Sequence, residues 1–254
     1  MDVQSVRAWE KSKHLQINYA IKWCKLNNIN IDAYYILCWN TYNTSENEEL
    51  VKISKNRLRY FFPKKDGVSF IKLQVSNIGD YSITPSTDSH RMATILYHQI
   101  STCKQSNYII TDATCGNAGN TIHFAYLFNK VNAVDISKLH YDITHHNISV
   151  YNLKNVNIIH ADYLQIMYKL NQDVIFIDPP WGGPKYKNYN KVPLYLGDQS
   201  INIIINNIIK KKCAKLIGIK IPHNFDVNSL YKYINSKQLS IYNFKKCKLI
   251  TILM

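Results

Sequence analysis

Four carboxylates in the second half of the chain stand where apolar segments end, and open α/β sheets bind ligands at such positions. They are Asp112, Asp135, Asp162 and Asp178. Asp135 follows Asp112 by 135 − 112 = 23 residues, and a carboxylate there can accept hydrogen bonds from both hydroxyls of a ribose. Asp162 can accept from the exocyclic amine of adenine. Each carboxylate alone is more often a helix N-cap. Together they indicate an adenosine without a pyrophosphate, and hence S-adenosylmethionine.

A loop with two glycines connects Asp112 to the next helix. The segment reads Thr111-Asp112-Ala113-Thr114-Cys115-Gly116-Asn117-Ala118-Gly119-Asn120-Thr121. Gly116 and Gly119 permit a tight turn and a close approach of the backbone to a ligand. Their spacing is G-x-x-G rather than G-x-G-x-x-G, so the dinucleotide fingerprint is absent. An ordinary strand-to-helix turn explains this loop equally well when it is taken alone.

The most specific signal is the tetrapeptide Asp178-Pro179-Pro180-Trp181, followed by Gly182-Gly183-Pro184. An exocyclic amine on a planar base is a poor nucleophile, because its lone pair is delocalised into the ring. Asp178 and the Pro179 carbonyl can accept its two hydrogens, and the prolines hold these acceptors rigid. Trp181 offers a face on which the base can stack. A proline turn with a core tryptophan is the simpler explanation, but the two glycines favour clearance for a large ligand.

The elements that must position these residues become regular after residue 80. Apolar strands are expected at 108–113, 131–136, 156–160, 174–178 and 214–221, and helices at 86–101, 120–128, 138–151, 163–170, 198–211 and 226–236. Thr84 is expected to cap the first of these helices, with Pro85 at its first position. The alternation predicts an α/β fold with a mostly parallel sheet. Strands 239–244 and 249–254 should add a C-terminal antiparallel hairpin.

The composition is that of a basic, folding chain. The 254 residues are 46% hydrophobic and carry 31 Lys and Arg against 17 Asp and Glu, a net charge of +14. This excess favours an anionic partner such as nucleic acid, although an AT-rich genome would produce it too. Six cysteines form no C-x-x-C pair, so neither a metal site nor a disulfide framework is expected. No apolar stretch reaches the roughly 18 residues of a membrane span.

The segment Phe176 to Pro184 resembles the signature of the trimethylguanosine synthases, the RNA cap guanine-N2 methyltransferases. The similarity extends to Tyr81-Ser82-Ile83-Thr84-Pro85, to Asp112 through Thr121, to Asn147 and to Lys220-Ile221-Pro222. It covers residues 81–254, whereas residues 1–75 match poorly. The resemblance implies a class I methyltransferase fold over 81–254. It also implies a small, mainly helical N-terminal extension over 1–80 that helps to bind substrate.

The resemblance also assigns expected roles. Asp178 and Pro179 would hold the target amine, with Asp112 beside them as a catalytic residue. The cofactor S-adenosylmethionine would contact Thr84, Pro85, Asp112, Cys115, Gly116, Asn120, Thr121, Asp135, Asp162 and Asp178. The cationic 7-methylguanine would contact Trp181, Asn147, Pro180 and Pro222. Its triphosphate would meet basic residues, with Lys55, Arg57, Arg59, Lys64, Lys65, Lys185 and Lys187 as candidates.

One departure keeps two alternatives open. The family usually has Ser where this chain has Asp178, and Asp is the choice of several DNA adenine-N6 and ribosomal RNA guanine-N2 methyltransferases. A third possibility is a catalytically inactive module that binds caps or RNA, against which the intact carboxylates argue. The expected partner is capped RNA, without a membrane, and the chain is expected to be monomeric. The expected location is the nucleus or cytoplasm, or the host cytoplasm if the protein is viral.

Overall fold

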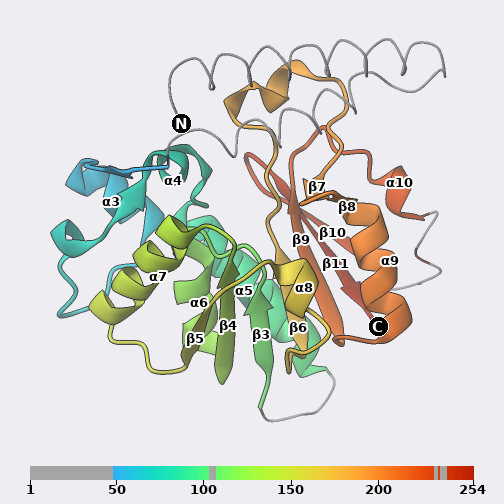
Figure 1. The fold of residues 1–254 in the computed structure, drawn as a ribbon, viewed down its shortest axis with the longest axis horizontal. Coiled ribbons are helices and arrows are strands. Elements are labelled where there is room, and N and C mark those ends of the chain that lie inside the picture. The colour runs from blue at the N-terminus through green and yellow to red at the C-terminus, as the bar shows by residue number, and fades with distance from the viewer. Residues whose placement is uncertain (1–47, 103–106, 232–233, 235–238) are drawn as a thin grey trace, which may run out of the picture.

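The computed structural model describes residues 48–102, 107–231, 234 and 239–254, and a seven-stranded sheet forms their centre (Figure 1). The strand order is β10-β11-β9-β6-β3-β4-β5. The strands are β3 (Ile109–Asp112), β4 (Lys130–Asp135), β5 (Val156–His160), β6 (Val174–Ile177), β9 (Leu216–Ile221), β10 (Leu239–Asn243) and β11 (Lys248–Leu253). β11 runs antiparallel to both β9 and β10, and the other pairings are parallel. The predicted mostly parallel sheet and its C-terminal hairpin are confirmed.

Helices cover both faces of this sheet. They are α5 (Ser86–Ser101), α6 (Gly119–Leu127), α7 (Lys138–Val150), α8 (Tyr163–Ile166), α9 (Ile201–Lys211) and α10 (Asn228–Tyr231). Side chains of α5 and α6 pack on one face of the sheet, in a cluster that includes Leu96, Phe124 and Phe176. Side chains of α8 and α9 pack on the other face, in a cluster with Ile175 and Ile219. Successive strand residues point to opposite faces, so both faces of a parallel sheet must be apolar.

The order of the strands determines where ligands can bind. The chain runs outward from β3 through β4 to β5 and then returns to place β6 on the other side of β3. Ligands of open α/β sheets bind at the carboxyl ends of the strands beside such a reversal. Asp112 ends β3, Asp135 ends β4 and Asp178 directly follows β6. The topology therefore gathers at one edge the carboxylates that the sequence spreads over 67 positions, from 112 to 178.

Two details at helix starts differ from the sequence-based expectation. Helix α5 has the predicted bounds, but Pro85 rather than Thr84 occupies its N-cap position, with a ψ of 140°. Helix α9 begins at Ile201 because a two-stranded hairpin, β7 (Tyr195–Leu196) and β8 (Gln199–Ser200), precedes it. Gly197 turns this hairpin at a φ of +59°, a conformation that favours glycine.

The described part of the N-terminal segment is not a separate body. It contains β1 (Leu50–Val51), α3 (Lys55–Phe61), the 3₁₀ turn η1 (Phe70–Lys72), β2 (Val75–Ser76) and α4 (Asn77–Ser82). Its apolar side chains, among them Phe62 and Val75, share a core with Ile122 of α6 and Ile148 of α7. The expected helices are thus accompanied by a small two-stranded sheet, while residues 1–47 lie outside the described part.

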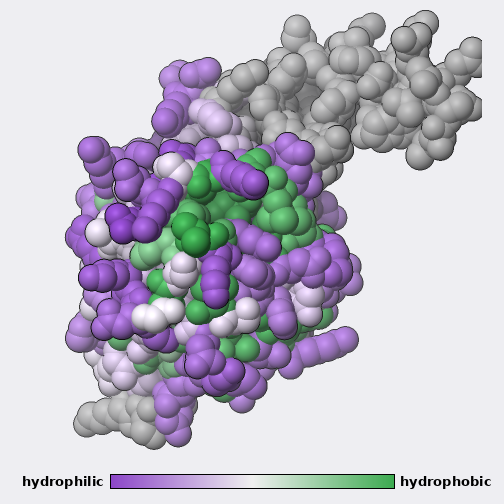
Figure 2. Space-filling view, turned by 90° about the vertical axis from the view of Figure 1, so that its left-hand side faces the viewer, coloured by the Kyte–Doolittle hydropathy of each residue, from purple (hydrophilic) through white to green (hydrophobic). Residues whose placement is uncertain are grey.

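The side of the molecule that carries α3 and α7 has a mixed surface. Figure 2 shows apolar side chains gathered there within a hydrophilic surround. In the described part of the N-terminal segment, Leu50 and Ile71 are exposed apolar residues. No helix within the described ranges is both long and apolar enough to cross a membrane.

Candidate active site

Asp112 is a completely buried carboxylate at the end of β3. Its Oδ2 accepts a hydrogen bond of 2.6 Å from the hydroxyl of Thr121 on α6, whereas its buried Oδ1 has no hydrogen-bond partner among the described residues. Burial, and secondarily the nearby charge of Asp178, raise the pKa of Asp112 to about 7. A buried carboxylate oxygen without a partner is costly. Asp112 is therefore placed to accept from a cationic or N–H group of a ligand.

Two backbone N–H groups of the loop after Asp112 donate hydrogen bonds to β4. The N–H of Cys115 donates to Val134 in β4 at 2.9 Å, and the N–H of Gly116 donates to Asp135 Oδ2 at 2.8 Å. Gly116 has a φ of +53°, and no atom of the described residues outside its own turn lies within 4 Å of the position that a Cβ would take. The described part of the chain thus leaves space beside Gly116. The Cys115 side chain is buried, and this burial raises the pKa of its thiol.

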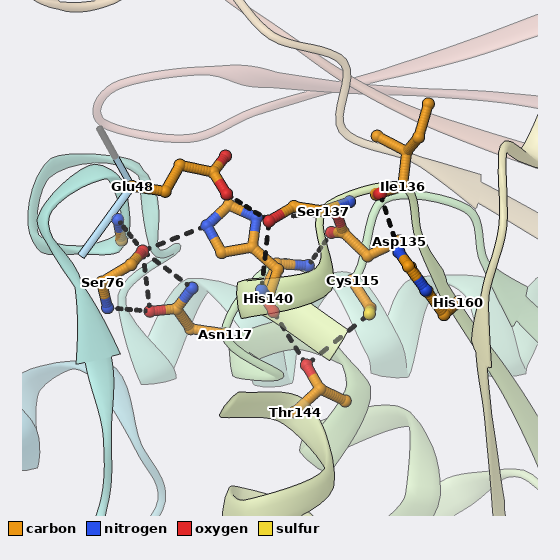
Figure 3. Close-up of polar contacts among 12 residues, drawn as sticks. Glu48, Ser76, Cys115, Asn117, Asp135, Ile136, Ser137, His140, Thr144 and His160 are labelled. Carbon is orange, nitrogen blue, oxygen red and sulfur yellow. Dashed lines mark hydrogen bonds and ion pairs between the residues drawn. The ribbon is translucent and has the colours of Figure 1, made fainter. Parts of the chain in front are cut away.

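Asp135 is tied into a polar network with the N-terminal segment (Figure 3). Its Oδ1 accepts from the N–H of Ser137 at 2.9 Å and lies 3.6 Å from Nδ1 of His140. The other ring nitrogen of His140 is 3.1 Å from the hydroxyl of Ser76. Burial disfavours the protonated imidazole, but the carboxylates of Asp135 and Glu48 prevail and raise the pKa of His140. Sequence reasoning missed His140, because only the fold brings Ser76 and α7 together.

A pocket opens between Asp135 and Asp162. It is lined by Ala113, Thr114, Asp135, Ile136, Ala161, Asp162, Tyr163, Leu196 and Gly197. Asp162 caps α8 by accepting from the N–H of Leu164 at 2.9 Å, so its N-cap role and its place in the pocket coexist. The sequence analysis missed Ile136, Leu196 and Gly197. The Gly197-Asp198 pair between two short β-prone runs was the available signal, since such pairs mark tight hairpins.

The tetrapeptide after β6 carries an ion pair that the sequence did not reveal. Asp178 Oδ2 lies 2.6 Å from Nζ of Lys220 on β9, and both side chains are largely buried. The same ammonium lies 5.0 Å from the ring centroid of Trp181. Tyr186 meets Trp181 edge to face at 5.1 Å, and the indole N–H of Trp181 is buried without a partner. Pro179 is buried, whereas Pro180 is exposed.

A basic groove with two aromatic rings lies next to Trp181. It is lined by Tyr186, Lys187, Tyr189, His223, Asn224, Lys245 and Lys246. The side-chain amide of Asn224 donates to the carbonyls of Tyr186 and Tyr189 at 3.0 and 2.7 Å. It thereby joins the loop after β9 to the loop after β6. Pro222, at the start of the β9 loop, is buried.

The groove revises the expected set of basic contacts. Lys187, one of the predicted basic residues, lines it together with Lys245 and Lys246 of the β10–β11 turn, which the sequence-based prediction did not include. Arg57 is instead paired with Asp80, and Lys65 donates to the carbonyl of Tyr151. The lysines of the turn could have been noticed as adjacent charges between the last two strands.

Three expected contact residues turn inward instead. Asn147 is fully buried, and its amide donates to the carbonyls of Gln74 and Asn117 and accepts from the N–H of Gln74. The contact of Asn147 with the target base stays a prediction, and the structure shows that its amide is engaged within the protein. Asn120 and Thr84 are buried and hydrogen-bonded to one another at 3.4 Å. Neither lines the pocket beside Asp135, and they hold the start of α6 against the start of α5.

The sheet order, its single inserted antiparallel strand and the row of carboxylates at the strand ends define a class I methyltransferase fold. The family model of the RNA cap guanine-N2 methyltransferases matches residues 107–254. The chain belongs to this family, and the protein is a methyltransferase.

The chain is similar to several known proteins. The trimethylguanosine synthase of Saccharomyces cerevisiae is 29% identical over 232 residues, which are 88% of this chain and 69% of that protein. An uncharacterized protein of Acanthamoeba polyphaga mimivirus is 28% identical over 152 residues, which are 59% of each chain. The chain thus spans between 59% and 69% of the length of these relatives. Among solved structures, an rRNA methylase from Streptococcus thermophilus has 15% identity and a TM-score of 0.43, over 66% of this chain and 93% of that chain.

Proposed function

We propose that the protein transfers a methyl group from S-adenosylmethionine to the exocyclic N2 amine of a 7-methylguanosine cap on RNA. The observation that carries this proposal is the position of Asp178-Pro179-Pro180-Trp181. The tetrapeptide follows β6 and lies between the pocket beside Asp135 and Asp162 on one side and the basic groove on the other. Groups that suit a methyl donor, a planar amine and an anionic chain therefore lie next to one another.

The residues present suit S-adenosylmethionine. The unpaired Oδ1 of Asp112 would accept from the ammonium of its methionine part, beside the open backbone at Gly116. Asp135 would hold the ribose, and Asp162 and Ile136 would hold the adenine. When bound, this cofactor supplies an electrophilic methyl group, whose C–S bonding electrons stay on sulfur in S-adenosylhomocysteine.

Asp178 acts on the nucleophile. Its carboxylate and the Pro179 carbonyl accept the two amine hydrogens, which directs the nitrogen lone pair toward the methyl carbon. The new N–C bond forms from that lone pair, and the proton that the nitrogen then loses passes to Asp178 or to water. Positioning and polarisation of the amine provide the rate enhancement, with no covalent intermediate on the protein.

Recognition of a capped RNA rests on two neighbouring surfaces. A cationic 7-methylguanine on the indole of Trp181 gains about 0.5–2 kcal/mol from the cation–π interaction. The groove with Lys187, Lys245 and Lys246 supplies positive charge for the cap phosphates. The partner we propose is therefore capped RNA, bound by a single copy of the chain.

The test is methyl transfer from labelled S-adenosylmethionine by the purified protein to 7-methyl-GDP, GDP and an unmethylated oligonucleotide. We expect transfer to 7-methyl-GDP and a rate about 2- to 30-fold lower with GDP, because the uncharged base loses the cation–π attraction. Transfer to the oligonucleotide instead would favour an adenine or ribosomal RNA substrate, for which Asp178 in place of Ser is the supporting observation. Binding of cap and cofactor without transfer would favour a catalytically inactive module.

Binding of the cofactor should depend on pH through Asp112. Its pKa of about 7 in the free protein means that the carboxylate is protonated at acidic pH, and only the ionised form attracts an ammonium group. The Kd of S-adenosylhomocysteine should therefore rise about tenfold from pH 8 to pH 6. Calorimetry across this range tests the expectation. Asp112→Asn should bind more weakly and lose this dependence, and a slope that persists in the variant would assign it to another group.

A further inference from the structure

Lys220 makes the only ion pair that the structure shows for Asp178 among the described residues. It stands on β9, where its backbone pairs with Leu249 of β11, and its residue exposure is 6%. Its Nζ lies 2.6 Å from Asp178 Oδ2 and 5.0 Å from the centroid of the Trp181 ring. One ammonium thus contacts the two side chains to which the proposed function assigns the amine and the base.

The buried position of Asp178 creates a need for this cation. Burial raises the pKa of Asp178, and the charge and hydrogen bond of Lys220 oppose that rise. Among the described residues, Asp112 on β3 interacts electrostatically with Asp178, and Cys247 before β11 interacts with both members of the pair and with Asp88 on α5. Of the charged groups among these neighbours, only Lys220 is a cation, so removing it would leave Asp178 beside other acids in a poorly solvated site.

The ion pair also fixes which oxygen of Asp178 is free to act. Lys220 engages Oδ2, which leaves Oδ1 as the oxygen with more capacity to accept the amine hydrogen. The N–H of Asp178 donates to the hydroxyl of Thr114 at 3.0 Å, which anchors the backbone of the same residue. A protonated or freely rotating Asp178 would be a weaker and less directed acceptor.

We propose that Lys220 is a positioning residue for methyl transfer, which keeps Asp178 ionised and directs its Oδ1 toward the target amine. This inference rests on the proposed function of the site. It adds that the acceptor is a lysine–aspartate pair rather than the aspartate alone.

A double-mutant cycle tests the coupling. The variants are Lys220→Met, Asp178→Ser and the two together, assayed with 7-methyl-GDP at saturating S-adenosylmethionine. Lys220→Met should lower kcat at pH 7 by about 10- to 100-fold, since Asp178 then holds a proton. Part of the loss should return at pH 9, because Asp178 ionises there. In the Asp178→Ser background, Lys220→Met should lower kcat by less than about twofold.

A matched control is present at the other end of the same two strands. Lys215, just before β9, pairs with Asp173, just before β6, at 2.9 Å. Lys215→Met removes a lysine from a more exposed pair away from the site, since the Lys215 side chain is 45% exposed against 7% for Lys220, and it should change kcat by less than about twofold. Lys220→Arg keeps a cation and should retain more activity than Lys220→Met. An equal loss from Lys220→Met in both Asp178 backgrounds, without recovery at high pH, would show a merely structural role and overturn the inference.

A second readout separates the inference from the proposed function. If the wild-type protein methylates none of the nucleotides offered, the proposed function fails, but the ion pair can still be tested by urea unfolding between pH 5 and pH 8. When the pKa of a carboxyl group is higher in the folded than in the unfolded state, the free energy of unfolding of the protein falls as the pH rises toward the folded-state pKa. Lys220→Met should therefore lose stability over this range more steeply than the wild type, and Lys220→Met with Asp178→Ser should not. Identical slopes in all variants would show that Lys220 does not keep Asp178 ionised.

Discussion

Replacement of Asp178 by Ala is expected to lower kcat for methyl transfer by about 100- to 1000-fold. The variant removes the carboxylate that accepts the amine hydrogen and leaves only the Pro179 carbonyl. It leaves Asp112, Asp135 and Asp162 in place, so the affinity for S-adenosylhomocysteine should change by less than about threefold. The measurement is steady-state transfer to 7-methyl-GDP together with calorimetry of the cofactor product.

The control must account for the lysine that this substitution leaves unpaired. Lys220 would stay buried without its partner, which costs stability by itself. Asp173→Ala similarly deprives Lys215 of a carboxylate at the opposite end of β6, so it reports the cost of breaking such a pair away from the site. A kcat for Asp178→Ala within tenfold of that for Asp173→Ala would contradict the role given to Asp178.

Replacement of Trp181 by Ala should raise KM for 7-methyl-GDP by about 10- to 100-fold, since stacking on an aromatic ring contributes about 1–3 kcal/mol per base. The effect on GDP should be smaller, because the uncharged base gains nothing from the cation–π interaction. Transfer rates measured over a range of each nucleotide give both values. Trp181 also packs against Tyr186 and lies beneath Lys220, so kcat is expected to fall as well.

Trp181→Phe separates stacking from packing. It keeps an aromatic face with a weaker attraction for cations, so its KM for 7-methyl-GDP should rise by less than about tenfold. Full activity of Trp181→Ala with 7-methyl-GDP would refute the stacking role. If Trp181→Ala lost the same affinity for GDP and for 7-methyl-GDP, the stacking role of Trp181 would stand, but its preference for a cationic base would be refuted.

The alternation of apolar strands and helices after residue 80 was readable because it depends on local periodicity. Strand 156–160 was predicted with its observed bounds, and most others within one or two residues. The start of α9 was missed because the β7–β8 hairpin takes residues 199–200. The helix pattern continues through residues 199–200, but the turn at Gly197 and the pairing of residues 195–196 with 199–200 outweigh it.

The sequence by itself determined the chemistry-bearing residues of the strand ends. Asp112, Asp135, Asp162 and Asp178 follow apolar segments, and a parallel sheet places the ends of its strands at one edge. The family signature in Phe176 to Pro184 is likewise a property of adjacent residues. These features are local, so they do not depend on knowing which distant segments meet.

Only the tertiary structure decided which side chains face the site and which pair with one another. It turned Asn147 into the core, where its amide joins Gln74 to Asn117. It placed Lys220 against Asp178 from 42 positions away in the chain. It also brought Lys245 and Lys246 to the groove beside Trp181. The physical reason is that burial and ion pairing depend on long-range packing, and the spacing of residues along one chain does not encode such contacts.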